Sequence, residues 1–164
     1  MDTQLYELSE KAGHALKARG FMMATAESCT GGWIGQVMTM VPGSSRWFDR
    51  GFVTYTNDAK QEMLGVQSAT LKEFGAVSEQ TVKEMVEGAL ARSRAQVAVA
   101  VSGIAGPDGG TPTKPVGTVM LAWGSKPGDI VSRAMRFSGD RDSVRRQTVI
   151  AALEGVLGML ARKD

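Results

Sequence analysis

Ser28 lies in a run of small residues where a predicted strand turns into a helix, Glu27-Ser28-Cys29-Thr30-Gly31-Gly32. In α/β proteins a nucleophile or an anion-binding loop often occupies such a turn. The chain has one histidine, His14. It falls roughly 140° from the centre of its helix's apolar stripe at 100° per residue, so it should face solvent. If Ser28 does chemistry, its base is therefore not imidazole, and Lys60 is the best candidate.

Lys60 follows Tyr55 by five residues. Thr56 or Asn57 can cap a short helix that runs through Leu64, which places Lys60 in the first turn. The positive end of the helix dipole, together with any burial, lowers the pKa of a lysine from about 10.4 toward the range of a usable base. Tyr55, on the adjoining strand, could orient Lys60 or relay a proton.

Both residues have structural alternatives. Ser28 or Thr30 can simply cap the helix that follows, and most lysines are exposed side chains without a catalytic role. The segment also departs from the Gly-x-Ser-x-Gly elbow of hydrolases, because Ala26 and Thr30 stand at the two glycine positions. The local pattern therefore allows either a serine nucleophile with a lysine base or a capped helix beside a surface lysine.

Two further segments could contact an anionic ligand. Residues 102–112 follow an apolar strand and contain four glycines, which favours close backbone approach to a ligand, although a flexible connection is the alternative. This loop lacks the sequence of a P-loop and the spacing of a dinucleotide fingerprint. Arg141 and Arg145 share one face of the last predicted helix. Arginine forks match phosphate geometry, and a solvated charged face is the alternative.

Hydrophobic periodicity predicts strands that alternate with helices. Helices are expected at about 4–19, 31–40, 57–64, 79–90 and 140–160, and strands at about 21–26, 52–56, 97–101, 117–123 and 130–137. The strand at 97–101 is apolar on both faces, as at the centre of a sheet, and the last two strands resemble a hairpin. We therefore expect one domain over residues 1–164. Its fold class should be α/β, a three-layer α/β/α sandwich with a mixed, mostly parallel sheet.

Composition narrows the class of protein. The 164 residues are 43% hydrophobic and 22% charged with a net charge of +2, which fits a globular domain and gives no dense basic stripe for nucleic acid. The single cysteine excludes an internal disulfide. No apolar run approaches the ~20 residues of a membrane span, and no signal peptide is recognisable. We expect a cytoplasmic protein without nucleic-acid or membrane partners. Trp47 and Phe48, in a loop-like stretch, suit either a subunit interface or the core, and we expect a homodimer.

Five stretches between residues 25 and 148 together resemble the CinA C-terminal domain family. They are, in order, TAESCTGGWIGQ, VPGSSRWFDRGFVTYTNDAKQEMLGV, GAVSEQTVKEM, VAVSGIAGPDGGTPTKPVGTV and FSGDRDSVRRQT. The resemblance implies hydrolysis of the carboxamide of nicotinamide mononucleotide to nicotinate mononucleotide and ammonia, in pyridine-nucleotide recycling, without a cofactor or a metal.

Site roles follow from the same resemblance. It implies Ser28 as nucleophile, Lys60 as base and Tyr55 as the partner of the lysine. The family often has threonine at the position of Ser102, where serine keeps the hydroxyl. The expected substrate-binding residues are Thr30, Gly31, Gly32, Ser102, Gly103, Ala105, Gly106 and Arg141. The alternative is a nucleotide-binding or regulatory module that has lost turnover.

Overall fold

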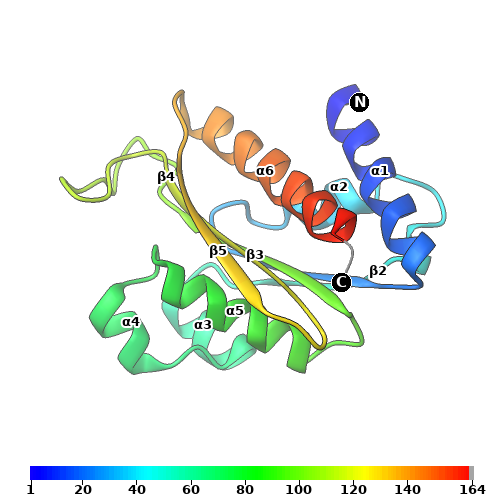
Figure 1. The fold of residues 1–164 in the computed structure, drawn as a ribbon. Helices are drawn as coiled ribbons and strands as arrows, with labels where there is room; N and C mark the ends of the chain where they lie inside the picture. The colour runs from blue at the N-terminus through cyan, green and yellow to red at the C-terminus, as the bar shows by residue number, and fades with distance from the viewer. Residues whose placement is uncertain (163–164) are drawn as a thin grey trace.

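The structure is a computed structural model that describes residues 1–162, and it places one sheet between two layers of helices (Figure 1). The strands are β1 (Met23–Glu27), β2 (Phe48–Val53), β3 (Val97–Gly103), β4 (Thr118–Ser125) and β5 (Ile130–Arg136). The α-helices are α1 (Thr3–Arg19), α2 (Trp33–Met38), α3 (Asn57–Leu64), α4 (Ser68–Phe74), α5 (Glu79–Ala91) and α6 (Arg141–Ala161), with a 3₁₀ turn η1 at Ser44–Arg46.

The sheet has the order β2-β1-β3-β4-β5. Strand β1 pairs in parallel with both β2 and β3, whereas β4 is antiparallel to β3 and β5. Four strands therefore share one direction and β4 opposes them. This confirms the mixed sheet, the α/β/α layering and the hairpin of β4 and β5. Because β1, β2 and β3 are parallel neighbours, their carboxyl ends meet at one edge of the sheet, where ligands of such sheets gather.

The two faces of the sheet carry side chains of different size. Helices α1, α2 and α6 cover a face that includes Val99 and Leu121, and α3, α4 and α5 cover the opposite face (Figure 1). The second face is built largely from alanines, namely Ala24, Ala26, Ala98, Ala100 and Ala122. Small side chains in the sheet let α5 lie close to it, and all these alanines are fully buried.

Helix α3 is held against α5 by a close backbone approach at Gly88. A Cβ added to Gly88 would lie 2.0 Å from the carbonyl oxygen of Leu64, the last residue of α3. No real side chain fits there, so glycine is required at this crossing. Helix α3 begins at the predicted cap, because the Thr56 hydroxyl accepts a hydrogen bond from the Ala59 amide at 3.0 Å. Gly65 ends α3 with a left-handed backbone conformation. These contacts fix the helix that carries Lys60.

The structure corrects one predicted strand, adds one helix and decides between the two alternatives for Trp47 and Phe48. The strand predicted at 52–56 runs from Phe48 to Val53 and ends before Tyr55. Helix α4 was not predicted, because Leu71 is its only buried residue and it therefore has no apolar stripe. Trp47 is only 3% exposed and packs in the core with the half-buried Phe48, so this pair is not an exposed apolar surface.

Candidate active site

Ser28 follows β1 directly, at the edge where three parallel strands end. Its amide donates to the carbonyl oxygen of Val101 on β3 at 3.2 Å, and the amide of Thr54, which follows β2, donates to the carbonyl oxygen of Glu27 at 2.8 Å. The ladder thus continues one residue past β1 and β2. These bonds fix the backbone on both sides of Ser28, so the nucleophile candidate stands on the rigid part of the fold.

Residues 28–32 form the nucleophile loop, and the buried carboxylate of Glu27 holds this loop in place. Glu27 is only 1% exposed. Its side chain accepts hydrogen bonds from the amides of Ile34 at 2.9 Å and Gly35 at 3.0 Å, and from the Thr30 hydroxyl. The two amides belong to the first turn of α2, where N–H groups have no partner within the helix and a negative charge is favourable. Glu27 therefore ties the loop to the helix that follows it.

Lys60 reaches the nucleophile from α3. Its Nζ lies 3.0 Å from Ser28 Oγ, 3.0 Å from the carbonyl oxygen of Thr54 and 3.3 Å from that of Tyr55. The side chain is 1% exposed. Burial is the main cause that lowers the pKa of Lys60 from 10.5 to about 8, while the nearby Cys29 acts weakly in the opposite direction.

The three neighbours of Lys60 Nζ match the hydrogen-bonding capacity of a neutral amine. A neutral amine has two N–H bonds and one lone pair. The carbonyls of Thr54 and Tyr55 can only accept, so they take the two N–H groups. The lone pair then remains for the Ser28 hydroxyl, which can donate its proton to it. The geometry therefore suits proton transfer from Ser28 to Lys60.

A pocket of about 240 Å³ opens over this pair. Its lining residues are Ser28, Cys29, Tyr55, Asn57, Lys60, Ala76, Val77, Ser102, Gly103, Ala105 and Arg141. Seven of the predicted site residues are thus brought together at the ends of β1 and β3 and the start of α3 and α6. Four others do not line it: Thr30, Gly31, Gly32 and Gly106. Thr30 is fully buried, and its hydroxyl is bonded to Glu27.

Tyr55 and Arg141 meet at the pocket. The Tyr55 side chain is 57% exposed, and its hydroxyl accepts a hydrogen bond from Arg141 Nη2 at 3.1 Å. Arg141 Nη1 donates to the carbonyl oxygen of Gly106 at 2.9 Å. Tyr55 therefore touches Lys60 through its backbone carbonyl, whereas its phenol pairs with Arg141. Arg141 joins the 102–112 loop to the segment before α3.

Sequence reasoning missed Asn57, Ala76 and Val77 as pocket residues. Asn57 lies in the first turn of α3 together with Lys60, which was a usable signal, but Ala76 and Val77 precede α5 without any chemical signature. Burial raises the pKa of the Cys29 thiol from 9.0 to about 11. This thiol is protonated at neutral pH, which leaves Ser28 as the stronger nucleophile candidate.

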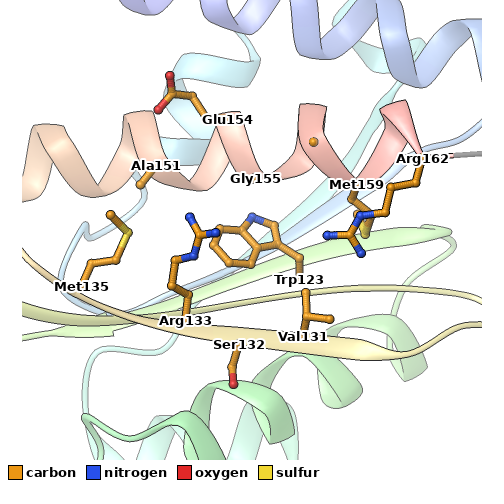
Figure 2. A pocket seen from close by; sticks show the side chains of 11 residues that line it. Trp123, Val131, Ser132, Arg133, Met135, Ala151, Glu154, Gly155, Met159 and Arg162 are labelled. Atoms are coloured by element: carbon orange, nitrogen blue, oxygen red, sulfur yellow. The ribbon is translucent and has the colours of Figure 1, made fainter.

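Another pocket, of about 420 Å³, lies between β5 and α6 and shares no lining residue with the first. Figure 2 shows the side chains of Arg133 and Arg162 on either side of Trp123. Its lining offers no serine beside a lysine or histidine base. The smaller pocket over Ser28 is therefore the candidate active site.

Residues 1–162 contain neither a candidate metal cluster nor a helix suited to span a membrane. They hold no cluster of three or more His, Cys, Asp or Glu side chains suited to a metal ion. No helix in this range is both long and apolar enough to cross a membrane.

Comparison with known proteins places the chain among close relatives. Residues 5–160 match the family model described as the CinA C-terminal domain. A protein named nicotinamide-nucleotide amidohydrolase PncC from Escherichia coli K12 is 57% identical over 153 residues, which are 93% of both chains. A protein of the same name from Pseudomonas putida is 54% identical over 150 residues, 92% of this chain and 93% of the relative.

Solved structures agree in fold. The crystal structure of competence/damage inducible protein CihA from Agrobacterium tumefaciens has a TM-score of 0.94 and 49% identity, covering 99% of this chain and 98% of that one. A CinA superfamily protein from Klebsiella pneumoniae has a TM-score of 0.92 and 40% identity, covering 96% and 98%. Both likenesses extend over the whole sandwich.

Proposed function

The chain belongs to the CinA C-terminal domain family, and we propose that it hydrolyses the carboxamide of nicotinamide mononucleotide. The products are nicotinate mononucleotide and ammonia. The observation that carries the proposal is the 3.0 Å contact between Lys60 Nζ and Ser28 Oγ inside a pocket. Relatives more than half identical are named nicotinamide-nucleotide amidohydrolases, which supports the substrate.

In the first step Ser28 Oγ attacks the carboxamide carbon while neutral Lys60 takes the hydroxyl proton. A new O–C bond forms and the carbonyl becomes a tetrahedral oxyanion. Its collapse breaks the C–N bond, and the protonated Lys60 gives its proton to the departing nitrogen, which leaves as ammonia. Lys60, neutral again, then removes a proton from water. That water forms a bond to the acyl carbon, the C–O bond to Ser28 breaks, and Lys60 gives its proton to the departing Ser28 Oγ as the carboxylic acid product leaves.

The oxyanion needs hydrogen-bond donors that the fold has not already used. The amide of Gly31 donates to the carbonyl oxygen of Ser28 at 3.0 Å, so it is occupied. The amides of Cys29, Thr30 and Gly32 have no oxygen acceptor among residues 1–162. We assign the oxyanion pocket to this part of the nucleophile loop. One such donor is typically worth ~2.7–4 kcal/mol of the barrier.

Arg141 is our candidate for the ribose phosphate. Its guanidinium bonds only to two uncharged oxygens, on Gly106 and Tyr55, and no salt bridge neutralises it among the described residues. A phosphate dianion would accept a stronger, charge-assisted pair of bonds from the same fork. Ser102, Gly103 and Ala105, across the pocket, complete the substrate contacts in this proposal. Tyr55 is proposed to act on Lys60 through its carbonyl and on substrate through its phenol.

The test is ammonia release from nicotinamide mononucleotide by the purified protein and four variants. Ser28→Ala and Lys60→Met should each lose turnover by at least about a thousandfold, because catalytic groups that act as one unit each cost most of the chemistry. Ser68→Ala and Lys83→Met, at exposed positions on α4 and α5, should keep wild-type activity. Nucleotide binding without ammonia release by the wild type would instead support the non-catalytic module.

A homodimer in the cytoplasm remains part of the proposal. Since Trp47 and Phe48 pack into the core, they no longer support a subunit interface. Sedimentation equilibrium measures the mass of the assembly directly, and a 17.4 kDa species at micromolar concentration would rule out the dimer. Cell fractionation tests the location.

A further inference from the structure

Arg145 of α6 is bonded to the nucleophile loop through two consecutive carbonyls. Its Nε donates to the carbonyl oxygen of Cys29 at 3.0 Å and its Nη2 to that of Thr30 at 3.1 Å. Its guanidinium also lies over the ring of Trp33, with the carbon 5.4 Å from the ring centroid. The planar guanidinium thus bonds two adjacent peptide groups, and its contact with the Trp33 ring fixes its position.

The hydrogen bonds from Arg145 to these two carbonyls also fix the direction of the N–H groups in the same peptide units. A peptide group is planar and trans, so its N–H points opposite to its C=O. The carbonyl of Cys29 therefore sets the direction of the Thr30 amide, one of the three loop amides without an oxygen acceptor among the described residues. The cation also polarises this peptide and makes its N–H a stronger donor.

The loop's own hydrogen bonds, from the Gly31 amide to the Ser28 carbonyl at 3.0 Å and from the Trp33 amide to the Thr30 carbonyl at 3.1 Å, leave the Cys29 carbonyl without a partner. Gly31 and Gly32 both have positive φ, 60° and 107°, and glycine is the residue with most backbone freedom. Glu27 holds the loop from the α2 side, but it makes no bond to the Cys29 carbonyl, which among residues 1–162 accepts a hydrogen bond only from Arg145. A Cβ added to Gly31 would lie 3.7 Å from Arg145 Nη2, so the guanidinium packs directly against Gly31.

We propose that Arg145 is a positioning residue for hydrolysis, which clamps the nucleophile loop so that its free amides face the oxyanion. This inference rests on the proposed function, because the reaction in which Arg145 would act is the proposed amide hydrolysis. Arg145 acts through the loop and not through Lys60, whose pKa is set by burial and by Cys29. It is distinct in role from Arg141, which reaches the 102–112 loop and Tyr55.

The test compares Arg145→Met, Arg145→Lys and the matched control Arg146→Met. Arg146 is the next residue on α6 and pairs with Asp2 at the surface, at 3.0 Å. Removing a whole oxyanion donor costs about 10²–10³ in kcat, so a misaligned donor in Arg145→Met should cost at least about tenfold in kcat. KM should stay within about twofold, since the effect is confined to the transition state. Arg145→Lys should recover part of the loss, and Arg146→Met should match the wild type.

The pH profile separates positioning from other roles. In Arg145→Met the midpoint of the rising limb, where Lys60 loses its proton, should stay where the wild type has it, because Lys60 is untouched. A shifted midpoint, an unchanged kcat per folded molecule, or a rise in KM without loss of kcat would each overturn the inference. Far-ultraviolet circular dichroism and the unfolding midpoint give the folded fraction for each variant.

A second readout does not depend on the substrate. A fluorophosphonate probe reacts when Ser28 Oγ gives its proton to Lys60 and forms a bond to phosphorus while fluoride leaves, and the developing charge on the phosphoryl oxygen uses the same amides. Labelling of the Ser28 peptide, followed by mass spectrometry, should be at least about tenfold slower in Arg145→Met and unchanged in Arg146→Met. Equal labelling rates would overturn the role of Arg145. Failure of the proposed function alone would appear as labelling without ammonia release from the nucleotide.

Discussion

The pH dependence of turnover is the most quantitative consequence of the buried lysine. Lys60 must be neutral to accept the proton of Ser28, so kcat/KM should rise with pH as the amine loses its proton. Burial lowers its pKa from 10.5 to about 8. At pH 7 the neutral fraction is then about 0.1, whereas an exposed lysine would be neutral in only about 0.0003 of molecules. Burial therefore supplies about 300-fold more of the reactive form at neutral pH.

The assay is kcat/KM for ammonia release from nicotinamide mononucleotide between pH 6 and pH 10. The expected profile climbs with a slope of one per pH unit, bends near pH 8 and reaches a plateau about tenfold above the pH 7 value. A profile that still climbs with a slope of one at pH 10 would mean that burial does not activate Lys60. A flat profile from pH 6 upward would mean that no group with this pKa acts as the base.

Three other predictions follow from the same structure. The first concerns the free energy of unfolding in urea, measured for the wild type and for Lys60→Met. The wild-type value minus the Lys60→Met value should increase by about 2.5 kcal/mol from pH 7 to pH 10, because a pKa lowered in the folded state makes the unfolded chain bind more protons. A difference that stays constant with pH would contradict the buried amine. Arg141→Ala should raise KM more than it lowers kcat in steady-state kinetics, and an unchanged KM would remove Arg141 from phosphate binding. Gly88→Ala must push α3 away from α5, so it should cost about 1–3 kcal/mol of stability and also reduce kcat, whereas wild-type values for both would contradict the tight crossing.

Much of the site was predictable because its residues lie at element boundaries with clear local signals. Ser28 follows a short strand and precedes glycines, and Lys60 falls in the first turn of a helix with a threonine cap and a glycine end. The parallel neighbours β1 and β3 then bring Ser28 and Ser102 to one edge of the sheet. Periodicity and capping placed these residues at element boundaries, whereas the resemblance to the family implied that they act together.

The details of hydrogen bonding were not predictable from local sequence. Thr54 and Tyr55 have strong strand propensity, yet their carbonyls accept bonds from Lys60 instead of continuing β2. Arg145 looked equivalent to Arg141 on one helix face, but it reaches carbonyls more than a hundred residues earlier in the chain. Which partner each of these groups bonds depends on the tertiary structure around it, and the spacing of residues in the sequence does not determine this.

The central claim is that the Ser28 oxygen, activated by neutral Lys60, becomes covalently acylated. The direct measurement is rapid acid quenching of the wild-type protein with nicotinamide mononucleotide, followed by peptide mass spectrometry. The account predicts an adduct of the nucleotide, less one ammonia, on the peptide that contains Ser28, formed together with one equivalent of ammonia and absent in Lys60→Met. An adduct on any other side chain, or ammonia release from Ser28→Ala at the wild-type rate, would contradict it.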